Sequence, residues 1–80
     1  MPYCLTRKGP TGNGKNTVFN QIYEIENQAN GMVLDISGIG LTDERVFSDL
    51  KKAFSYRSCS HLDIVIVIKN GEIIKIIERT

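Results

Sequence analysis

Apolar residues recur at three- and four-residue steps in two stretches of the chain, and this spacing predicts two helices. The first is "TVFNQIYEIENQA", residues 17–29. Asn16 is a suitable N-cap for it, and Asn30-Gly31 can supply the left-handed residue that ends it. The second helix spans about residues 43–55, with Thr42 as its N-cap. Its predicted buried stripe consists of Val46, Phe47, Leu50 and Phe54.

Four shorter runs predict strands: "PYCLT" (2–6), "MVLDIS" (32–37), "HLDIVIVIK" (61–69) and "EIIKIIER" (72–79). Asn70-Gly71 between the last two is a favoured two-residue hairpin turn. The element order is therefore βαβαββ, and strand–helix–strand units favour parallel pairing with right-handed crossovers. We predict an α/β (α+β) fold, namely one small domain over residues 1–80 with a four-stranded mixed sheet, two helices and a C-terminal β-hairpin.

The size and composition of the chain agree with one globular domain. Its 80 residues are 41% apolar and 24% charged, with a net charge of +1. The longest apolar run, "IVIVI", is far short of the ~20 residues that cross a bilayer, so we expect a cytoplasmic protein with no membrane partner. Cys4 and Cys59 are too few for a disulfide framework. They are either two buried thiols, which we favour, or one bridge.

Residues 9–17, "GPTGNGKNT", differ at one position from the P-loop pattern G-x-x-x-x-G-K-[ST]. Gly9, Gly14 and Lys15 are in register, but Asn16 replaces the hydroxyl residue that would reach Mg²⁺. The segment before the loop ends in two cations instead of an apolar strand. The chain is also too short for the sheet of a P-loop NTPase. We therefore expect neither nucleotide hydrolysis nor a nucleotide cofactor.

The same loop keeps the properties of an anion site. Residues 1–16 contain three cations and no acidic residue, and a glycine-rich loop that enters a helix offers backbone N–H groups to a phosphate. The alternative is an exposed, polar loop without a ligand. Tyr56-Arg57 after the second helix could also stack on RNA and pair with it. The predicted phosphate- or RNA-binding residues are Arg7, Lys8, Gly12, Gly14, Asn16, Thr17 and Arg57.

Lys15, Asp35 and His61 are the candidate catalytic residues. His61 precedes the strongest strand, where Asp63 would share its face, and such a pair can transfer protons when RNA is cleaved at its 2′-hydroxyl. Asp35 interrupts an apolar strand at its carboxyl end, which is the edge where parallel sheets bind ligands. The alternatives are a surface histidine and a carboxylate that caps the following turn.

Parallel strands would separate these groups. Asp35 would lie at the carboxyl end of its strand and Asp63 near the amino end of the next one, so we predict no metal site. The same geometry would separate His61 from Lys15. The closing strand places Lys75 and Arg79 on one face and Glu72 and Glu78 on the other, which is typical of an edge strand protected by charge.

The layout resembles that of the toxic C-terminal domains of bacterial polymorphic toxins, in particular contact-dependent growth inhibition effectors. The shared features are the basic entry "RKGPTGNGKN", the helix "TVFNQIYEIENQ" and the closing hairpin "DIVIVIKNGEIIKIIER". This resemblance implies a nuclease that acts on tRNA or another RNA in a target cell and is neutralised by a cognate immunity protein. We favour a metal-independent ribonuclease without cofactors. The alternative is a non-enzymatic module, phage or antitoxin-like, that binds RNA or protein through the basic loop and the sheet edge.

Overall fold

The computed structural model describes residues 3–79; Met1, Pro2 and Thr80 lie outside the described residues, and with them the start of the predicted strand 2–6. The elements follow the predicted order, with one additional 3-10 helix, η1. They are β1 (Leu5–Lys8), α1 (Thr17–Glu24), β2 (Gly31–Asp35), α2 (Asp43–Ala53), η1 (Arg57–Cys59), β3 (Ile64–Lys69) and β4 (Glu72–Glu78). In this part of the chain, no helix is long and apolar enough to cross a membrane.

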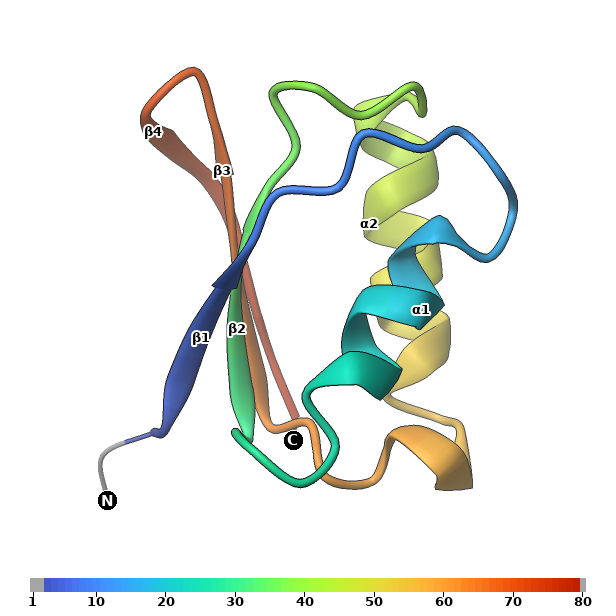
Figure 1. The fold of residues 1–80 in the computed structure, drawn as a ribbon, viewed down its shortest axis with the longest axis vertical. Coiled ribbons are helices and arrows are strands. Elements are labelled where there is room, and N and C mark those ends of the chain that lie inside the picture. Colours follow the sequence, from blue (N-terminus) through green and yellow to red (C-terminus); the bar gives the residue numbers. More distant parts are fainter. Residues whose placement is uncertain (1–2, 80) are drawn as a thin grey trace.

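The four strands form one mixed sheet in the order β1-β2-β3-β4. β1, β2 and β3 are parallel, and β4 returns antiparallel to β3. Both helices cover the same face of the sheet (Figure 1). Two right-handed crossovers that join strands in sequential order place their helices on one side. The predicted fold class is therefore confirmed, and the molecule has two layers.

The core lies between the sheet and the helices. On α1 and α2 it is built by the residues at the predicted three- and four-residue spacing, such as Val18, Ile22, Val46 and Leu50, all fully buried. On the sheet it is built by alternate residues of the central strands, which are Met32 and Leu34 in β2 and Val65 and Val67 in β3.

Within residues 3–79, no helix covers the opposite face of the sheet. Its central part is apolar, and several of its apolar side chains are exposed to solvent, particularly along β4. Those exposed by more than a third are Leu5, Ile73, Ile74 and Ile76. β4 is also an edge strand, so the backbone groups on its outer side have no neighbour in the sheet.

The hairpin between β3 and β4 is confirmed. Asn70 and Gly71 both have positive φ, 53° and 81°, as a tight two-residue turn of the type I′ class requires. Thr42 also caps α2 as predicted, because its hydroxyl oxygen accepts a hydrogen bond from the backbone N–H of Arg45 at 3.2 Å.

α1 begins at Thr17 with Asn16 at the N-cap position, as predicted, but the Asn16 side chain makes no capping hydrogen bond. Several predicted element ends were wrong, among them the start of β3, which is Ile64 rather than residue 61. α1 stops at Glu24 rather than at residue 29. β1 reaches to Lys8, so Arg7 and Lys8 belong to a strand and not to the loop. The apolar pattern locates an element well, but tertiary contacts decide where it ends.

The cysteines are free: Cys59 is buried as expected, whereas Cys4 is exposed. The prediction of a buried thiol was therefore wrong for Cys4. Its position just before β1 places it at the edge of the sheet, outside the apolar layer.

Gly31 does not terminate a helix, and its φ is not positive, so this prediction was also wrong. It is the first residue of β2, and it is buried. A Cβ atom at this position would lie 2.4 Å from Leu5 Cδ2 and 2.7 Å from Ile64 Cγ2. Glycine is needed here because the side chains of two neighbouring strands meet above it.

Replacing Gly31 by alanine should therefore lower the free energy of unfolding by about 1–2 kcal/mol, since the new methyl group forces Leu5 and Ile64 apart. Urea unfolding followed by circular dichroism measures this loss. Gly9→Ala is the matched control, because its Cβ would lie 4.0 Å from Asp35 Cβ, at ordinary contact distance. Equal midpoints for the two variants would contradict the packing argument.

Candidate functional site

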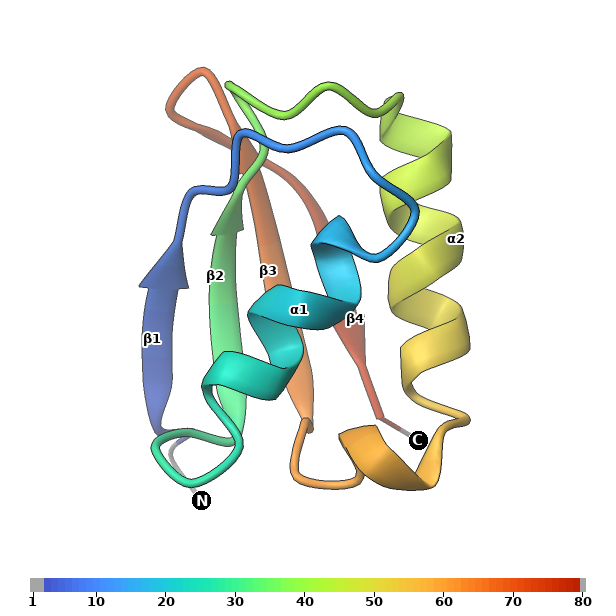
Figure 2. The ribbon, with the colours of Figure 1, turned by 45° about the vertical axis from the view of Figure 1, so that its right-hand side comes forward.

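The carboxyl ends of β1, β2 and β3 meet at one edge of the molecule, which we call the carboxyl edge. The loop of residues 9–16, the segment 36–42 and the β3–β4 turn all lie there (Figure 2). The opposite end, the amino edge, holds the turn after α1 and the 3-10 helix η1. In open parallel sheets, ligands bind at the carboxyl edge.

Asp35, at the end of β2, is the centre of a hydrogen-bond network at this edge. Its Oδ1 atom accepts hydrogen bonds from the backbone N–H and the hydroxyl of Ser37, at 3.0 and 2.6 Å. Its Oδ2 atom lies 3.0 Å from Nη2 of Arg7. The Ser37 hydroxyl oxygen in turn accepts from the backbone N–H of Asn70 at 2.8 Å. Asp35 therefore caps its turn, and the network joins β1, β2 and the hairpin.

These contacts lower the pKa of Asp35. The hydrogen bond from the Ser37 hydroxyl has the largest effect, followed by that from the Ser37 backbone, with a further contribution from the Arg7 guanidinium. All of them favour the ionised form. Asp35 is therefore a carboxylate at neutral pH, and a pKa this far from neutrality makes it a weak proton donor or acceptor. It is suited to orienting Arg7.

The lowered pKa predicts how Asp35 contributes to stability at different pH. Because its pKa is below the unfolded value of 3.8, its contribution is complete above that pH and disappears as the pH falls through the folded pKa. Asp35→Asn should therefore destabilise the protein at pH 6, and the gap to the wild type should close towards pH 3. Urea midpoints at both pH values test this; a gap of constant size would contradict it.

The glycine-rich loop is fixed against the segment that follows β2. The backbone N–H of Gly40 donates to the carbonyl of Gly12 at 3.1 Å. A Cβ at Gly40 would lie only 2.6 Å from Asn13 Cβ, so the loop and the turn are in close backbone contact. Where the loop enters α1, the N–H of Thr17 donates to the carbonyl of Gly14 at 3.1 Å. Loop 9–16 is thus held against segment 36–42 at Gly12 and Asn13, and it ends in a turn that leads into α1.

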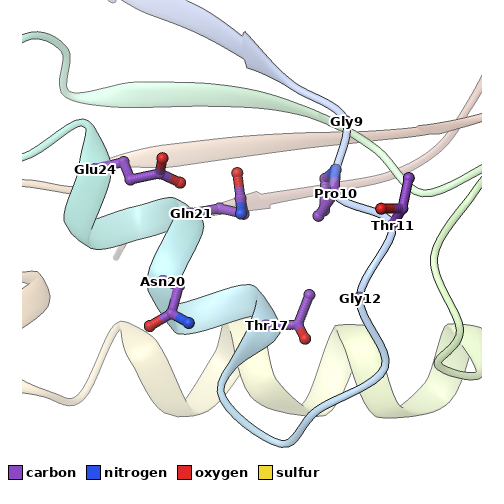
Figure 3. Close-up of a pocket in the computed structure, with 8 residues that line it drawn as sticks. All are labelled: Gly9, Pro10, Thr11, Gly12, Thr17, Asn20, Gln21 and Glu24. Carbon is purple, nitrogen blue, oxygen red and sulfur yellow. The ribbon is translucent and has the colours of Figure 1, made fainter.

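A pocket of about 460 Å³ lies between this loop and α1 (Figure 3). One wall is the start of the loop, and the other is a polar stripe of α1 whose residues follow the helical spacing. The side chains of Gln21 and Thr17 point from α1 towards the loop, and Pro10 and Thr11 face them. Its lining residues are Gly9, Pro10, Thr11, Gly12, Thr17, Asn20, Gln21 and Glu24.

The predicted phosphate-binding residues fall into different places. Gly12 and Thr17 line the pocket, while Lys15, Gly14 and Asn16 form the exposed turn that leads into α1. Register pairing with Val33 directs Arg7 to the open face of the sheet, where it meets Asp35. Lys8 pairs with Leu34 and therefore lies on the helix side. Arg57 is exposed on η1, at the amino edge, and the neighbouring Tyr56 ring stacks on Phe19 at 5.5 Å.

The candidate catalytic residues are not brought together. Lys15 and Asp35 belong to the carboxyl edge, whereas His61 lies in the turn before β3, at the amino edge. It is outside the strand, and its Nε2 atom lies 3.0 Å from the carbonyl oxygen of Ile22, to which it donates. The expected pairing with Asp63 was wrong, because Asp63 accepts from Asn30 Nδ2 at 3.1 Å and lies 3.7 Å from Arg79 Nε.

Other residues at the carboxyl edge were not singled out from the sequence. Lys69, at the end of β3, pairs with Asp43 at the start of α2 with an Nζ–Oδ1 distance of 3.0 Å. The rule that pointed to Asp35 would also have found Lys69. The polar stripe of α1 follows the same helical spacing as its apolar stripe, so the sequence does carry a signal for it. Over residues 3–79, no three His, Cys, Asp or Glu side chains are grouped so that they could hold a metal ion.

Comparison with known proteins agrees with this architecture. The family model of the contact-dependent growth inhibition CdiA C-terminal domain matches residues 6–74. No curated protein matches the chain. A solved structure of the CdiA-CT/CdiI toxin and immunity complex from Burkholderia pseudomallei contains a similar chain, with a TM-score of 0.71 and 21% identity. The match covers 92% of this chain and 55% of that one, so this chain spans about half the length of the Burkholderia chain. At this identity, the likeness shows a common fold.

Proposed function

Because the chain belongs to the CdiA C-terminal domain family of contact-dependent growth inhibition toxins, we propose that it is a toxin domain that cleaves RNA inside a bacterial target cell. The family assignment carries the toxin role, and it agrees with the resemblance seen in the sequence. We propose in addition that the substrate is RNA, for example tRNA, and that cleavage takes place in the cytoplasm of the target cell.

The arrangement of cations at the carboxyl edge supports RNA as the substrate. Arg7 is held by Asp35 yet has a side chain that is 66% exposed, so several of its N–H groups can still contact a phosphate. Lys15 stands in an exposed turn of the anchored loop. Arg7, on the open face of the sheet, and Lys15, in the turn that leads into α1, can each contact a phosphate of an RNA that lies along this edge.

Incubation of the purified domain with total bacterial RNA, with and without EDTA, tests the proposal. We expect discrete fragments in both samples, which is the outcome for a ribonuclease that needs no metal. Fragments that vanish in EDTA would show that the cleavage depends on a metal. Intact RNA at high protein concentration, together with salt-sensitive RNA binding, would overturn the enzymatic function in favour of a binding module.

A cognate immunity protein is the proposed partner. The similar Burkholderia chain was solved in a toxin and immunity complex. In this chain, the exposed isoleucines of β4 and its unpaired outer edge are the apolar surface that such a protein would cover. Amide hydrogen exchange of the complex should show protection in β4. Protection confined to loop 9–16 would instead place the immunity protein over the carboxyl edge.

A further inference from the structure

We propose that the pocket between loop 9–16 and α1 binds a single unpaired base of the RNA substrate and prefers guanine. This inference rests on the proposed function and names the part of the RNA that this region would read. It depends on the chemistry of the pocket walls, the freedom of their side chains and the position of the pocket beside the cationic turn.

The pocket walls fit a base better than a phosphate. None of the eight lining residues is a cation, and one of them, Glu24, is an acid that would repel a phosphate. The helix wall instead offers a hydroxyl, two amides and a carboxylate, from Thr17, Asn20, Gln21 and Glu24. Such groups read the edge of an unpaired base through hydrogen bonds.

These side chains are available for a ligand. Among the hydrogen bonds and ion pairs found within residues 3–79, none involves the side chains of Asn20, Gln21 or Glu24. The loop wall consists of Gly9, Pro10, Thr11 and Gly12, so it brings no charged side chain to the pocket. A volume of about 460 Å³ is enough for a base with its ribose.

The carboxylate of Glu24 provides the preference among bases. It has two oxygen atoms that accept hydrogen bonds and no donor. Guanine alone among the four RNA bases presents two adjacent donors, N1–H and N2–H, on its Watson–Crick edge. Adenine, cytosine and uracil each place an acceptor beside their donor. The amides of Asn20 and Gln21 can both donate and accept, so they add affinity for every base and leave the preference for guanine unchanged.

The position of the pocket connects it with the proposed cleavage site. Thr17 lines the pocket and is the first residue of α1, two positions after Lys15 in the exposed turn. The phosphates next to a base held in the pocket would therefore lie near a cation. The base that the pocket prefers would therefore determine at which nucleotide the RNA is held.

Titration of the ¹⁵N-labelled domain with 5′-GMP, 5′-AMP, 5′-CMP, 5′-UMP and inorganic phosphate tests the inference by NMR. We expect 5′-GMP to bind most tightly and to shift the amides of residues 9–12 and 17–24. Glu24→Gln should weaken 5′-GMP binding about tenfold, because one oxygen acceptor is replaced by a donor. Binding of inorganic phosphate should not weaken in this variant, because the substitution removes a negative charge. Glu26→Gln, two residues further on and outside the pocket, is the matched control and should bind as the wild type does.

The outcomes separate this inference from the proposed function. Equal affinities for the four nucleotides, an unchanged Glu24→Gln variant or no shifts in the pocket would overturn the inference, even if the domain cleaves RNA. Selective 5′-GMP binding with RNA left intact would support the pocket and overturn the ribonuclease proposal.

Discussion

Replacing Lys15 by alanine should lower the rate of RNA cleavage about a hundredfold and leave the thermal unfolding midpoint unchanged. Removal of one preorganised group that stabilises transition-state charge costs roughly 10²–10³ in rate. Lys15 is exposed, and no hydrogen bond or ion pair of its side chain is found within residues 3–79, so the fold does not depend on it. Single-turnover cleavage of a labelled RNA measures the effect.

Lys51→Ala is the matched control for this experiment. It removes the same charge from an exposed position in the last turn of α2, remote from the carboxyl edge. We expect it to cleave RNA at the wild-type rate. Equal losses in both variants would show that only net charge matters, and an unaffected Lys15→Ala variant would remove this lysine from the site.

His61→Gln should retain cleavage, because the structure separates His61 from the carboxyl edge.

Hydrophobic periodicity predicted the two helices, the strand–helix–strand order predicted the parallel part of the sheet, and Asn70-Gly71 predicted the hairpin. The end of α1 could not be predicted in this way. After Glu24 the chain turns towards contacts that are distant in sequence. Asn30 Oδ1 accepts from the N–H of Cys4 at 2.7 Å, and the N–H of Asp63 donates to the carbonyl of Asn30 at 2.7 Å. The helix stops early so that Asn30 can join β1 and β3.

Contacts between distant elements also explain why the position of Asp35 could be predicted and the partners of His61 and Asp63 could not. The strand-end rule correctly assigned Asp35 to the carboxyl edge, since this position depends only on strand direction. The pairing of His61 with Asp63 assumed that β3 begins three residues earlier than it does. Side-chain partners such as Asn30 and the Ile22 carbonyl come from other elements, and a single stretch of sequence carries no signal for them.

Arg79 is another residue whose role depends on distant contacts. Its position after an edge strand predicts a solvated charge, yet its guanidinium donates to three backbone carbonyls, those of Leu62, Phe54 and Cys59, at 2.9, 2.8 and 3.0 Å. It also lies over the Phe54 ring, 5.2 Å from the centroid. One side chain therefore ties the segment between α2 and β3 to the end of β4, in addition to the backbone hydrogen bonds of the turn and of η1.

Arg79→Ala should reduce the free energy of unfolding by about 3 kcal/mol, because three charge-assisted hydrogen bonds are lost. For a domain of this size the total is roughly 4–12 kcal/mol, so the melting temperature should fall by more than about 10 °C. Urea unfolding gives the loss directly. Lys75→Ala is the matched control, because the interaction found for the Lys75 side chain within residues 3–79 is a cation–π contact with Phe47 at 5.8 Å, worth about 1 kcal/mol or less.

If Arg79→Ala does not fold, Arg79→Lys takes its place in the test. Lysine keeps the charge but loses the planar fork, so this variant should fold and its urea midpoint should be below that of the wild type. A loss in Arg79→Ala no larger than that in Lys75→Ala would mean that the three carbonyls are solvated without cost. The turn between α2 and β3 would then be held mainly by the buried Cys59 and Leu62 side chains and by the backbone hydrogen bonds of the turn.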